Sequence, residues 1–258
     1  GWPGRVTSGG EARAQRIMGV LFDYGETLVG FTRPEEALRD AERRILALLT
    51  ASGRAGPSPA GVRAVQDRIE REVVDHQRSG NLEEIDVAAA SSRAYAEAGV
   101  HLDAALLDEV LRVEQEAWWH GAHLDPEAVP LLDTLRCRGL RVGLCSNAPY
   151  RVESLRAQLA FLGLESHLDA VTFSAEVGWR KPSPRIFDAA LRSLGTEADR
   201  TVMVGDSENV DIIGAHASGL RAVLLSRNGD RGSGVADAVI AALRELPGAL
   251  RNMGIYLE

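Results

Sequence analysis

The stretch VLFDYGETL, residues 20–28, indicates both the fold and the chemistry of this chain. It opens with three apolar residues, stops at the carboxylate of Asp23 and then turns through Gly25. A continuous apolar run is typical of a strand that is covered on both faces, as in a parallel sheet. A carboxylate at the end of such a strand is costly unless it is paired or lies at a functional opening. We therefore expect Asp23 to be a functional residue.

A second stretch, TVMVGDSENVD (201–211), repeats this pattern near the other end of the chain. An apolar run leads to Gly205, and two acids follow, Asp206 and Asp211. Taken alone, Gly-Asp-Ser before a helix is most often a helix N-cap. Combined with Asp23, it predicts a Mg²⁺ site, because this ion prefers hard carboxylate oxygens. We expect Asp23 and Asp206 as direct ligands and Asp211 as a ligand either directly or through water.

Two shorter segments supply the groups that a phosphate needs. Ser146 and Asn147 follow the apolar run 140–145, and a hydroxyl and backbone N–H groups at a strand-to-helix turn hold phosphate oxygens. Lys181 precedes Pro182 and offers a cation that stabilises charge in a transition state. Seen singly, the first segment is as often an N-cap, and a lysine is usually solvated. Together with the aspartates they predict a phosphoryl-transfer site.

Within that site we assign roles by chemistry. Asp23 is the expected nucleophile, attacking phosphorus through its carboxylate. Ser146, Asn147 and Lys181 are expected to bind the phosphate, and Ser146 and Lys181 to take part in catalysis. The hydroxyl of Thr27 is expected to fix the loop after Asp23, and Thr27 is grouped with the substrate-binding residues.

The order of patterns along the chain predicts an α/β fold with a doubly wound parallel sheet. Strand-like runs lie at residues 18–22, 140–145, 169–173, 201–204 and 221–225, and helical patterns lie at 126–138, 150–162, 184–194 and 209–218. Their alternation requires crossover connections between parallel strands. Such sheets bind ligands at the carboxyl ends of their strands, where all four segments described above fall.

The stretch 31–120 differs, since it contains no convincing strand. Four helical patterns fill it, and we expect an all-helical insert between a core of residues 16–30 and 121–258. Thr32-Arg33-Pro34-Glu35 is expected to form a capping box at the first helix, and Ser58-Pro59 to open the second. Residues 1–15 are expected to be a flexible leader or tag.

Composition narrows the class of protein. The 258 residues carry a net charge of −8, which argues against a nucleic-acid partner, and no apolar stretch approaches the roughly 20 residues of a membrane span. Two cysteines, Cys137 and Cys145, cannot build a disulfide framework, which favours a reducing cytoplasm. Cys145 lies inside an apolar run and is expected to be buried. A monomer or a homodimer is expected.

The four segments together resemble the haloacid dehalogenase superfamily, specifically its phosphatase branch, with a helical cap inserted after the first motif. The resemblance covers about residues 17–246 and places the family's motifs at Asp23 to Thr27, at Ser146, at Lys181 and at Gly205 to Asp211. It implies a Rossmann-like core, Mg²⁺, an aspartyl-phosphate intermediate and a cap that closes over a small phosphorylated substrate. It also implies a metal contact through the backbone carbonyl at Gly25.

One position departs from the family pattern. Phosphatases of this family usually carry a second aspartate two residues after the nucleophile, as a general acid and base, and here that residue is Gly25. General acid–base catalysis contributes roughly 10²–10⁴-fold. Three explanations stay open: Glu26 substitutes, the substrate has a good leaving group, or the protein is a weak or inactive relative that binds a ligand.

The dehalogenase branch of the family also lacks that aspartate. Its members work without a metal and do not need an acid at the position of Asp206, so Asp206 favours the phosphatase branch. A phosphomutase would need an acid to return the phosphoryl group. The sequence therefore predicts a Mg²⁺-dependent phosphatase acting on a small metabolite. Trp118, Trp119, His120 and His123 are expected to pack where insert and core meet rather than to line a pocket, and Arg33 to lie on the surface.

Overall fold

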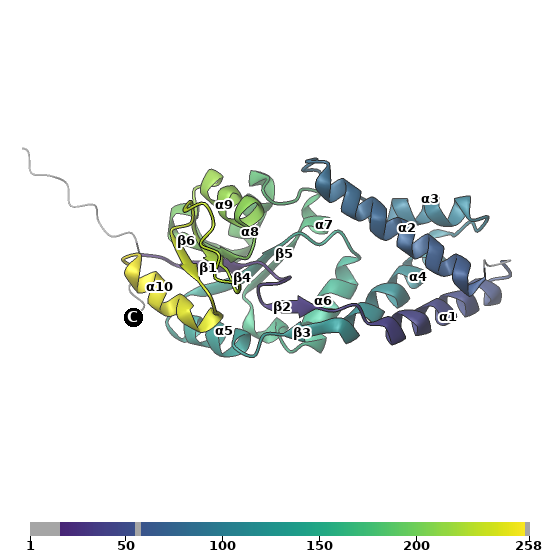
Figure 1. Cartoon of the computed structure of the whole chain (residues 1–258), viewed down its shortest axis with the longest axis horizontal. Coiled ribbons are helices and arrows are strands. Elements are labelled where there is room, and N and C mark those ends of the chain that lie inside the picture. Colours follow the sequence, from purple (N-terminus) through teal and green to yellow (C-terminus); the bar gives the residue numbers. More distant parts are fainter. Residues whose placement is uncertain (1–15, 55–57, 256–258) are drawn as a thin grey trace, which may run out of the picture.

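A six-stranded parallel sheet organises the core of the molecule in the computed structural model, which describes residues 16–54 and 58–255 (Figure 1). The expected leader, 1–15, lies outside the described residues. The strands are β1 (Gly19–Phe22), β2 (Val29–Phe31), β3 (Ala122–Leu124), β4 (Arg141–Ser146), β5 (Ala170–Phe173), β6 (Thr201–Gly205), β7 (Arg221–Leu225) and β8 (Ala238–Ile240). The sheet has the order β5-β4-β1-β6-β7-β8, so the predicted doubly wound α/β fold is confirmed.

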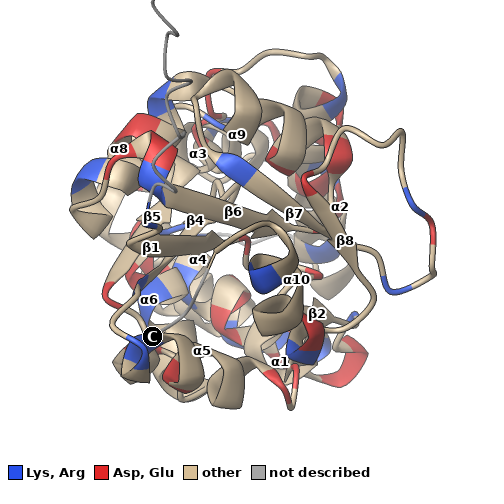
Figure 2. Cartoon of the chain, turned by 90° about the vertical axis from the view of Figure 1, so that its left-hand side faces the viewer, with Lys and Arg blue, Asp and Glu red and all other residues tan. Residues whose placement is uncertain are grey.

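Helices cover both faces of this sheet because both faces of its strands are apolar. The α-helices are α1 (Glu35–Ala51), α2 (Pro59–Arg78), α3 (Val87–Glu97), α4 (Ala104–Ala117), α5 (Ala128–Cys137), α6 (Val152–Phe161), α7 (Ser174–Val177), α8 (Pro184–Leu194), α9 (Ile213–Ala217) and α10 (Leu246–Asn252). Figure 2 shows α5, α6 and α10 on one face of the sheet and α8 and α9 on the other. Along β1, Val20 and Phe22 pack on the first side and Leu21 on the second, as expected for alternating side chains.

The four helices α1 to α4 lie together at the far end of the molecule from the sheet (Figure 1). They share an apolar cluster of their own, separate from the clusters of the sheet, with the fully buried Tyr95 and Ile45 among its members. Ser58 caps α2, since its side chain accepts a hydrogen bond from Gly61 N, as predicted. The described residues of the stretch 35–117 are thus mostly helical and pack around a local core.

The insert joins the core through a pair of short strands that the sequence analysis missed. β2 and β3 pair antiparallel, with Gly30 opposite His123. Each has only three residues, which is too short to leave a readable alternation. The last strand of the sheet, β8, was missed for the same reason.

The predicted capping box before α1 is wrong. Pro34 occupies the N-cap position and no side chain caps this helix. The hydroxyl of Thr32 instead lies 2.7 Å from His123 Nε2, across the β2–β3 pair. The Thr32 side chain, which the sequence pattern predicted to cap α1, therefore contacts His123 instead.

Short 3₁₀ segments and one π-helical segment complete the described chain. They are η1 (Trp118–Gly121), η2 (Glu165–His167), η3 (Ala198–Arg200), η4 (Glu208–Ile212) and η5 (Leu243–Glu245). The π-helical segment η4 precedes α9, so the single helix predicted over 209–218 is divided into two.

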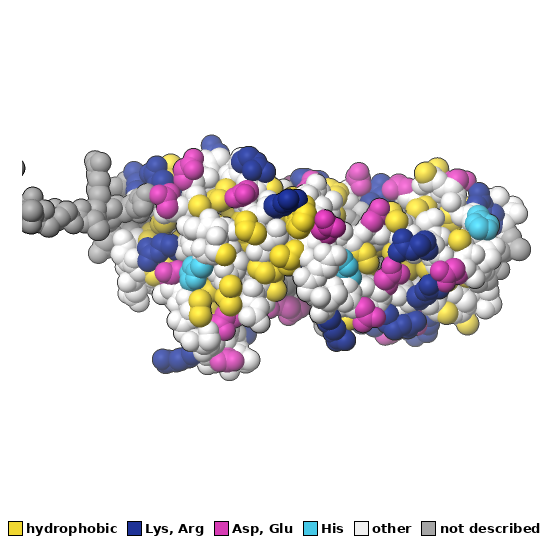
Figure 3. Space-filling view, turned by 90° about the horizontal axis from the view of Figure 1, so that it is seen from above, with side chains coloured by type: hydrophobic (Ala, Val, Ile, Leu, Met, Phe, Trp, Pro, Cys, Tyr) yellow, Lys and Arg dark blue, Asp and Glu magenta, His cyan; other side chains and the backbone are white. Residues whose placement is uncertain are grey.

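The surface mixes charges of both signs. On the face in Figure 3, basic and acidic side chains are interspersed over core and insert. Of the helices that the structure describes, none is both long and apolar enough to span a membrane. Cys145 is buried, as predicted, and burial raises the pKa of its thiol to about 12, whereas Cys137 is exposed.

Candidate active site

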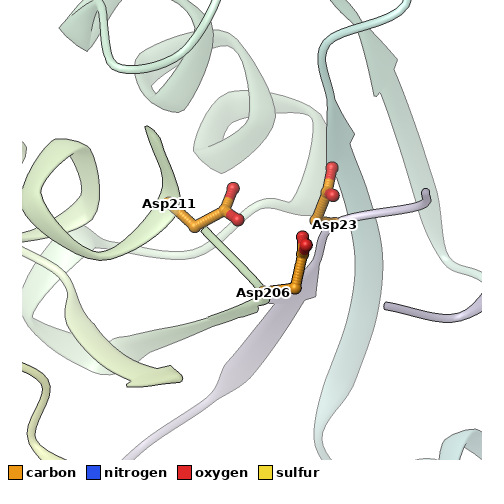
Figure 4. Close-up of side chains that lie close together, drawn as sticks. All are labelled: Asp23, Asp206 and Asp211. Atoms are coloured by element: carbon orange, nitrogen blue, oxygen red, sulfur yellow. The ribbon is translucent and has the colours of Figure 1, made fainter. Parts of the chain in front are cut away.

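Three aspartates meet at the carboxyl edge of the sheet. β1 lies between β4 and β6, so the residues that follow these three strands are neighbours. Asp23 follows β1 and Asp206 follows β6, while Asp211 comes from η4 (Figure 4). One carboxylate oxygen from each of the three lies within 4.8 Å of the others, and Figure 4 shows the carboxylates converging. The tertiary structure therefore brings together the three aspartate side chains that were predicted to bind the metal.

Lys181 lies against two of these aspartates. Its Nζ donates to Asp23 Oδ1 at 2.7 Å and to Asp211 Oδ1 at 2.6 Å. The side chain is 1% exposed, and burial acts to lower the pKa of its ammonium. The carboxylates of Asp211 and Asp23 outweigh that burial and raise the pKa, so Lys181 is a fixed cation beside the expected nucleophile.

Asn147 positions Lys181 rather than offering its side chain to a ligand. Its Oδ1 accepts from Lys181 N at 2.7 Å, and its Nδ2 donates to Lys181 O at 3.1 Å. This double hydrogen bond ties the turn after β4 to the chain before α8. The side-chain amide of Asn147 is therefore engaged with Lys181, and the phosphate binding expected at Asn147 through backbone N–H groups stays a prediction.

Both oxygens of Asp211 have partners. Oδ1 accepts from Lys181 and Oδ2 accepts from Ser207 N at 3.0 Å, and the side chain is 1% exposed. Burial raises the pKa of Asp211, and the Lys181 ammonium acts against that rise. The same packing makes Gly205 necessary, because a Cβ there would lie 2.3 Å from the Asp211 carboxyl group.

The charges of the cluster do not balance. Three carboxylates face one ammonium, which leaves an excess of two negative charges. Partial burial raises the pKa of Asp206, and repulsion from Asp23 raises it further. An oxygen-lined cluster with this excess fits a hard divalent cation such as Mg²⁺, which would restore neutrality.

Gly25 and Glu26 form the turn after Asp23. A Cβ at Gly25 would have only Phe31 Cε2 within 4 Å, at 3.8 Å, so there is room for a side chain. Glu26 has a left-handed backbone, with φ of 58°, and its exposed carboxylate accepts from Phe31 N at 3.3 Å. The one acid beside Gly25 along the chain is thus directed toward β2.

The hydroxyl groups of Ser146 and Thr27 lie in different surroundings. Ser146 is 4% exposed, lines a cavity described below, and its side chain has no hydrogen-bond partner among the described residues. Thr27 is fully buried, and its hydroxyl has no partner either within the described part of the chain. The expectation that this hydroxyl fixes the loop is wrong for this conformation; Arg227 instead donates to the backbone oxygen of Thr27 at 2.9 Å.

A cavity of about 310 Å³ runs from this edge of the sheet into the helical insert. Gly25, Ser146 and Asn147 line its core side. On the other side it is lined mainly by apolar and aromatic side chains and by a few acids and amides. The polar and aromatic side chains on this side include Arg33, Gln66, Glu70, Ser91, Glu114, Trp118, Trp119 and Tyr150.

Several of these residues were missed or underrated from the sequence. Trp118 and Trp119 were expected to pack rather than to line a pocket, and they do both, since Arg33 stacks on Trp118 at 5.7 Å while both tryptophans line the cavity. Arg33 was expected on the surface, and it lines the cavity as well. Glu114 carried a readable signal: it lies three residues after the buried Leu111, on the apolar stripe of α4.

A family model for haloacid dehalogenase-like hydrolases matches residues 17–219 of this chain. The chain belongs to this family. The matched range includes the three converging aspartates, Lys181 and Ser146. The resemblance to the haloacid dehalogenase superfamily inferred from the sequence is therefore confirmed.

Curated relatives and solved structures agree with that membership. The chain is 39% identical over 101 residues to a glyceraldehyde 3-phosphate phosphatase of Methanothermobacter thermautotrophicus, and 42% identical over 106 residues to a phosphoglycolate phosphatase of Rhodospirillum rubrum. These matches cover 39% and 41% of this chain, and they span less than half of the relatives, 44% and 43% of their lengths.

Two solved structures match nearly the whole chain. A haloacid dehalogenase-type phosphatase of Thermococcus onnurineus has a TM-score of 0.61 and 28% identity, covering 94% of this chain and 100% of its own. A 2-haloacid dehalogenase of Pseudomonas syringae has a TM-score of 0.67 and 27% identity, covering 92% of this chain and 99% of its own. The fold is thus similar to both branches of the family.

Proposed function

We propose that this protein is a Mg²⁺-dependent phosphatase that hydrolyses a small phosphorylated metabolite through an aspartyl-phosphate on Asp23. The observation that carries the proposal is the contact of Lys181 Nζ with Asp23, inside a cluster of three carboxylates. An ammonium at 2.7 Å holds the nucleophile in place. The names of the relatives, phosphatases acting on glyceraldehyde 3-phosphate and phosphoglycolate, support a substrate of this size.

In this mechanism an Asp23 oxygen forms a bond to phosphorus while the bond from phosphorus to the leaving-group oxygen breaks. Ser146 and Lys181 hold the phosphoryl oxygens, and Asn147 and Asp211 hold Lys181 in position. Asp23 and Asp206, with the backbone carbonyl of Gly25, would bind Mg²⁺, and Asp211 would contribute through water because both of its oxygens already accept hydrogen bonds. When bound, the ion neutralises charge between the acidic nucleophile and the anionic substrate.

The leaving group has to depart without a protonated carboxylic acid at position 25. Glu26 is directed toward Phe31, so we infer that the enzyme favours substrates with good leaving groups, such as acyl, anomeric or aryl phosphates. Water then attacks the aspartyl-phosphate, releases inorganic phosphate and restores the Asp23 carboxylate.

We further propose that the helical insert is a cap over the site. Beyond the β2–β3 pair it contacts the loop before Lys181: Arg180 N donates to Leu82 O and Glu84 N donates to Gly178 O, both at 2.9 Å. The cavity between core and insert would then enclose the organic part of the substrate. Exclusion of water in this way favours transfer to Asp23.

The test is phosphate release from p-nitrophenyl phosphate and acetyl phosphate with Mg²⁺. Asp23→Asn is expected to lower the rate by at least about 10³-fold, and chelation of the metal to abolish it. Asp188→Asn is the matched control, because Asp188 is exposed on α8, away from the cluster. A metal-independent rate, or full activity in Asp23→Asn, contradicts the proposal.

A dehalogenase is the second candidate, favoured by the Pseudomonas syringae structure and by Gly25. It predicts halide release from 2-chloropropionate in the presence of a chelator. A ligand-binding relative without activity would instead show thermal stabilisation by Mg²⁺ with phosphate but no turnover of any phosphate ester.

A further inference from the structure

The insert side of the cavity holds an acid that has no partner. Glu114 lies on α4 and lines the cavity, and it forms no hydrogen bond or ion pair within the part of the chain that the structure describes. Burial, with repulsion from Glu70, raises the pKa of its carboxyl group to about 7. An unpaired acid in a largely apolar cavity is destabilising, so the position of Glu114 indicates a ligand that compensates it.

The other charged groups of the cavity already have partners. Glu42 accepts from Arg63 at 2.7 and 3.0 Å, and Glu70 accepts from Arg33 at 3.0 Å. Arg33 also lies 3.2 Å from Glu35. Among the described residues that line the cavity, Glu114 is therefore the acid that no cation balances, and an anionic group beside its ionised form would be repelled.

Two further polar atoms in the cavity lack partners among the described residues. Ser91 is fully buried and its hydroxyl has no hydrogen-bond partner, and Gln66 Nε2, also buried, has none either. Both residues line the cavity. Buried polar groups are normally satisfied, so this group of atoms is built to meet polar atoms of a ligand.

The position of Glu114 relative to the phosphate site follows from Tyr150. This residue comes shortly after Ser146 and Asn147 in the sequence and lines the same cavity as Glu114. Tyr150, Ser146 and Glu114 line one continuous cavity. A phosphate held at Ser146 and Lys181 therefore leaves the organic part of an ester pointing along this cavity toward the insert.

We propose that the cavity selects phosphate monoesters whose organic part is largely apolar and ends in an ammonium group, with Glu114 as the counter-ion. Aromatic faces attract cations, and Tyr150, Trp118 and Trp119 line the same space. This inference takes the phosphate position from the proposed function. It adds a substrate class that differs from the anionic phosphoglycolate of the relative named above.

The experiment compares 4-(ω-aminoalkyl)phenyl phosphates, with alkyl chains of two to six carbons, with the 4-(n-alkyl)phenyl phosphates in which a methyl group replaces the ammonium. Aryl phosphates carry the good leaving group that a site without an acid at position 25 requires. For wild type, kcat/KM is expected to favour the amine about 10-fold or more at one chain length. Glu114→Gln should reduce that ratio to near one by slowing the amine substrate, and Glu114→Asp should retain part of it.

Glu109→Gln is the matched control, since Glu109 lies on the same helix but pairs with Arg112 and does not line the cavity. It should keep the preference of wild type. A wild type without preference for the amine, or a Glu114→Gln variant that slows all substrates equally, overturns the proposal.

Calorimetric measurement of ligand binding to the Asp23→Asn variant tests the cation site independently of the proposed phosphatase activity. Tighter binding of the aminoalkylphenyl phosphate than of its alkylphenyl analogue, lost on adding Glu114→Gln, supports the cation site even if no ester is hydrolysed. Equal binding of the two ligands refutes it, whatever the enzyme hydrolyses.

Discussion

At the scale of the residue, the position two after Asp23 separates this chain from the pattern expected of its family's phosphatases. Gly25 removes the acid but leaves its space empty, because the nearest side-chain atom, Phe31 Cε2, lies 3.8 Å from the point that a Cβ would occupy. The φ of Gly25 is not in the left-handed region, in contrast to that of Glu26. The backbone is thus compatible with a larger side chain at position 25.

Gly25→Asp should therefore fold and gain activity toward esters with poor leaving groups. We expect alkyl phosphates to react at least about 10-fold faster, within the range that general acid–base catalysis provides, and acetyl phosphate to change little. The measurement is kcat/KM for a series of leaving groups. Gly25→Asn has the same size without the proton and should show no gain; an equal gain in both variants would mean that the acid is not what is missing.

Gly205 is the opposite case, since a Cβ there would lie 2.3 Å from the carboxyl group of Asp211. Gly205→Ala should displace Asp211 and with it Lys181, lowering kcat by about 10-fold or more, with a stability loss of about 1–3 kcal/mol from overpacking. Phosphate release and thermal unfolding measure the two effects. Gly248→Ala is the control, because only Arg251 Nη2 lies near, at 3.8 Å, and it should leave kcat unchanged.

At the scale of the element, α4 and α6 hold insert and core together. Arg151, at the start of α6, donates to both oxygens of Asp108 on α4, at 2.6 and 3.0 Å, and its backbone N donates to Gln115 Oε1. Asp108 is 55% exposed, so the ion pair itself contributes at most about 1 kcal/mol. Its effect lies in orientation of the insert rather than in stability of the fold.

Arg151→Ala and Asp108→Ala should each raise KM by about two- to five-fold, and the double variant should be no worse than either, because all three lack the same contact. Steady-state kinetics test this. Arg156→Ala is the control, as its partner Glu176 belongs to the core helix α7. Strictly additive losses in the double variant would show that the two residues act independently.

At the scale of the whole molecule, the unpaired acid of the cavity links stability to pH. The pKa of Glu114 is raised from its ordinary value to about 7, so the native state binds a proton that the unfolded chain releases at lower pH. The contribution of this group to stability is therefore lost as the pH rises from about 4.5 to about 7.

Glu114→Gln should unfold at about the same temperature as wild type at pH 4.5 and at a higher temperature at pH 8. The gain expected at pH 8 is on the order of 1–3 kcal/mol, before any cationic ligand is added. Thermal denaturation at both pH values measures it, with Glu109→Gln as the control on the same helix outside the cavity. A gain that is equal at pH 4.5 and pH 8 would point to packing rather than to charge.

The sequence alone was sufficient for five of the six strands of the sheet and for the residues at its carboxyl edge. Continuous apolar runs that end in Asp23, Ser146 and Asp206 predict neighbouring strand ends, because parallel strands present their carboxyl ends on one side. Apolar periodicity likewise predicted the four helices of the insert. These features are local, since a few consecutive side chains determine them.

Only the tertiary structure decided how the polar groups are shared. In the folded chain the amide of Asn147 bonds to the backbone of Lys181, and the Thr32 hydroxyl lies against His123. Both carboxylate oxygens of Asp211 accept hydrogen bonds, from Lys181 Nζ and from Ser207 N. The tertiary structure also placed Glu114, without a partner among the described residues, in a cavity that reaches Ser146 and Gly25 at the edge of the sheet. Hydrogen bonds between residues far apart in the sequence depend on distances of a few tenths of an ångström, which no spacing along the chain encodes. For this reason the residues at the edge of the sheet could be predicted, but their hydrogen-bond partners could not.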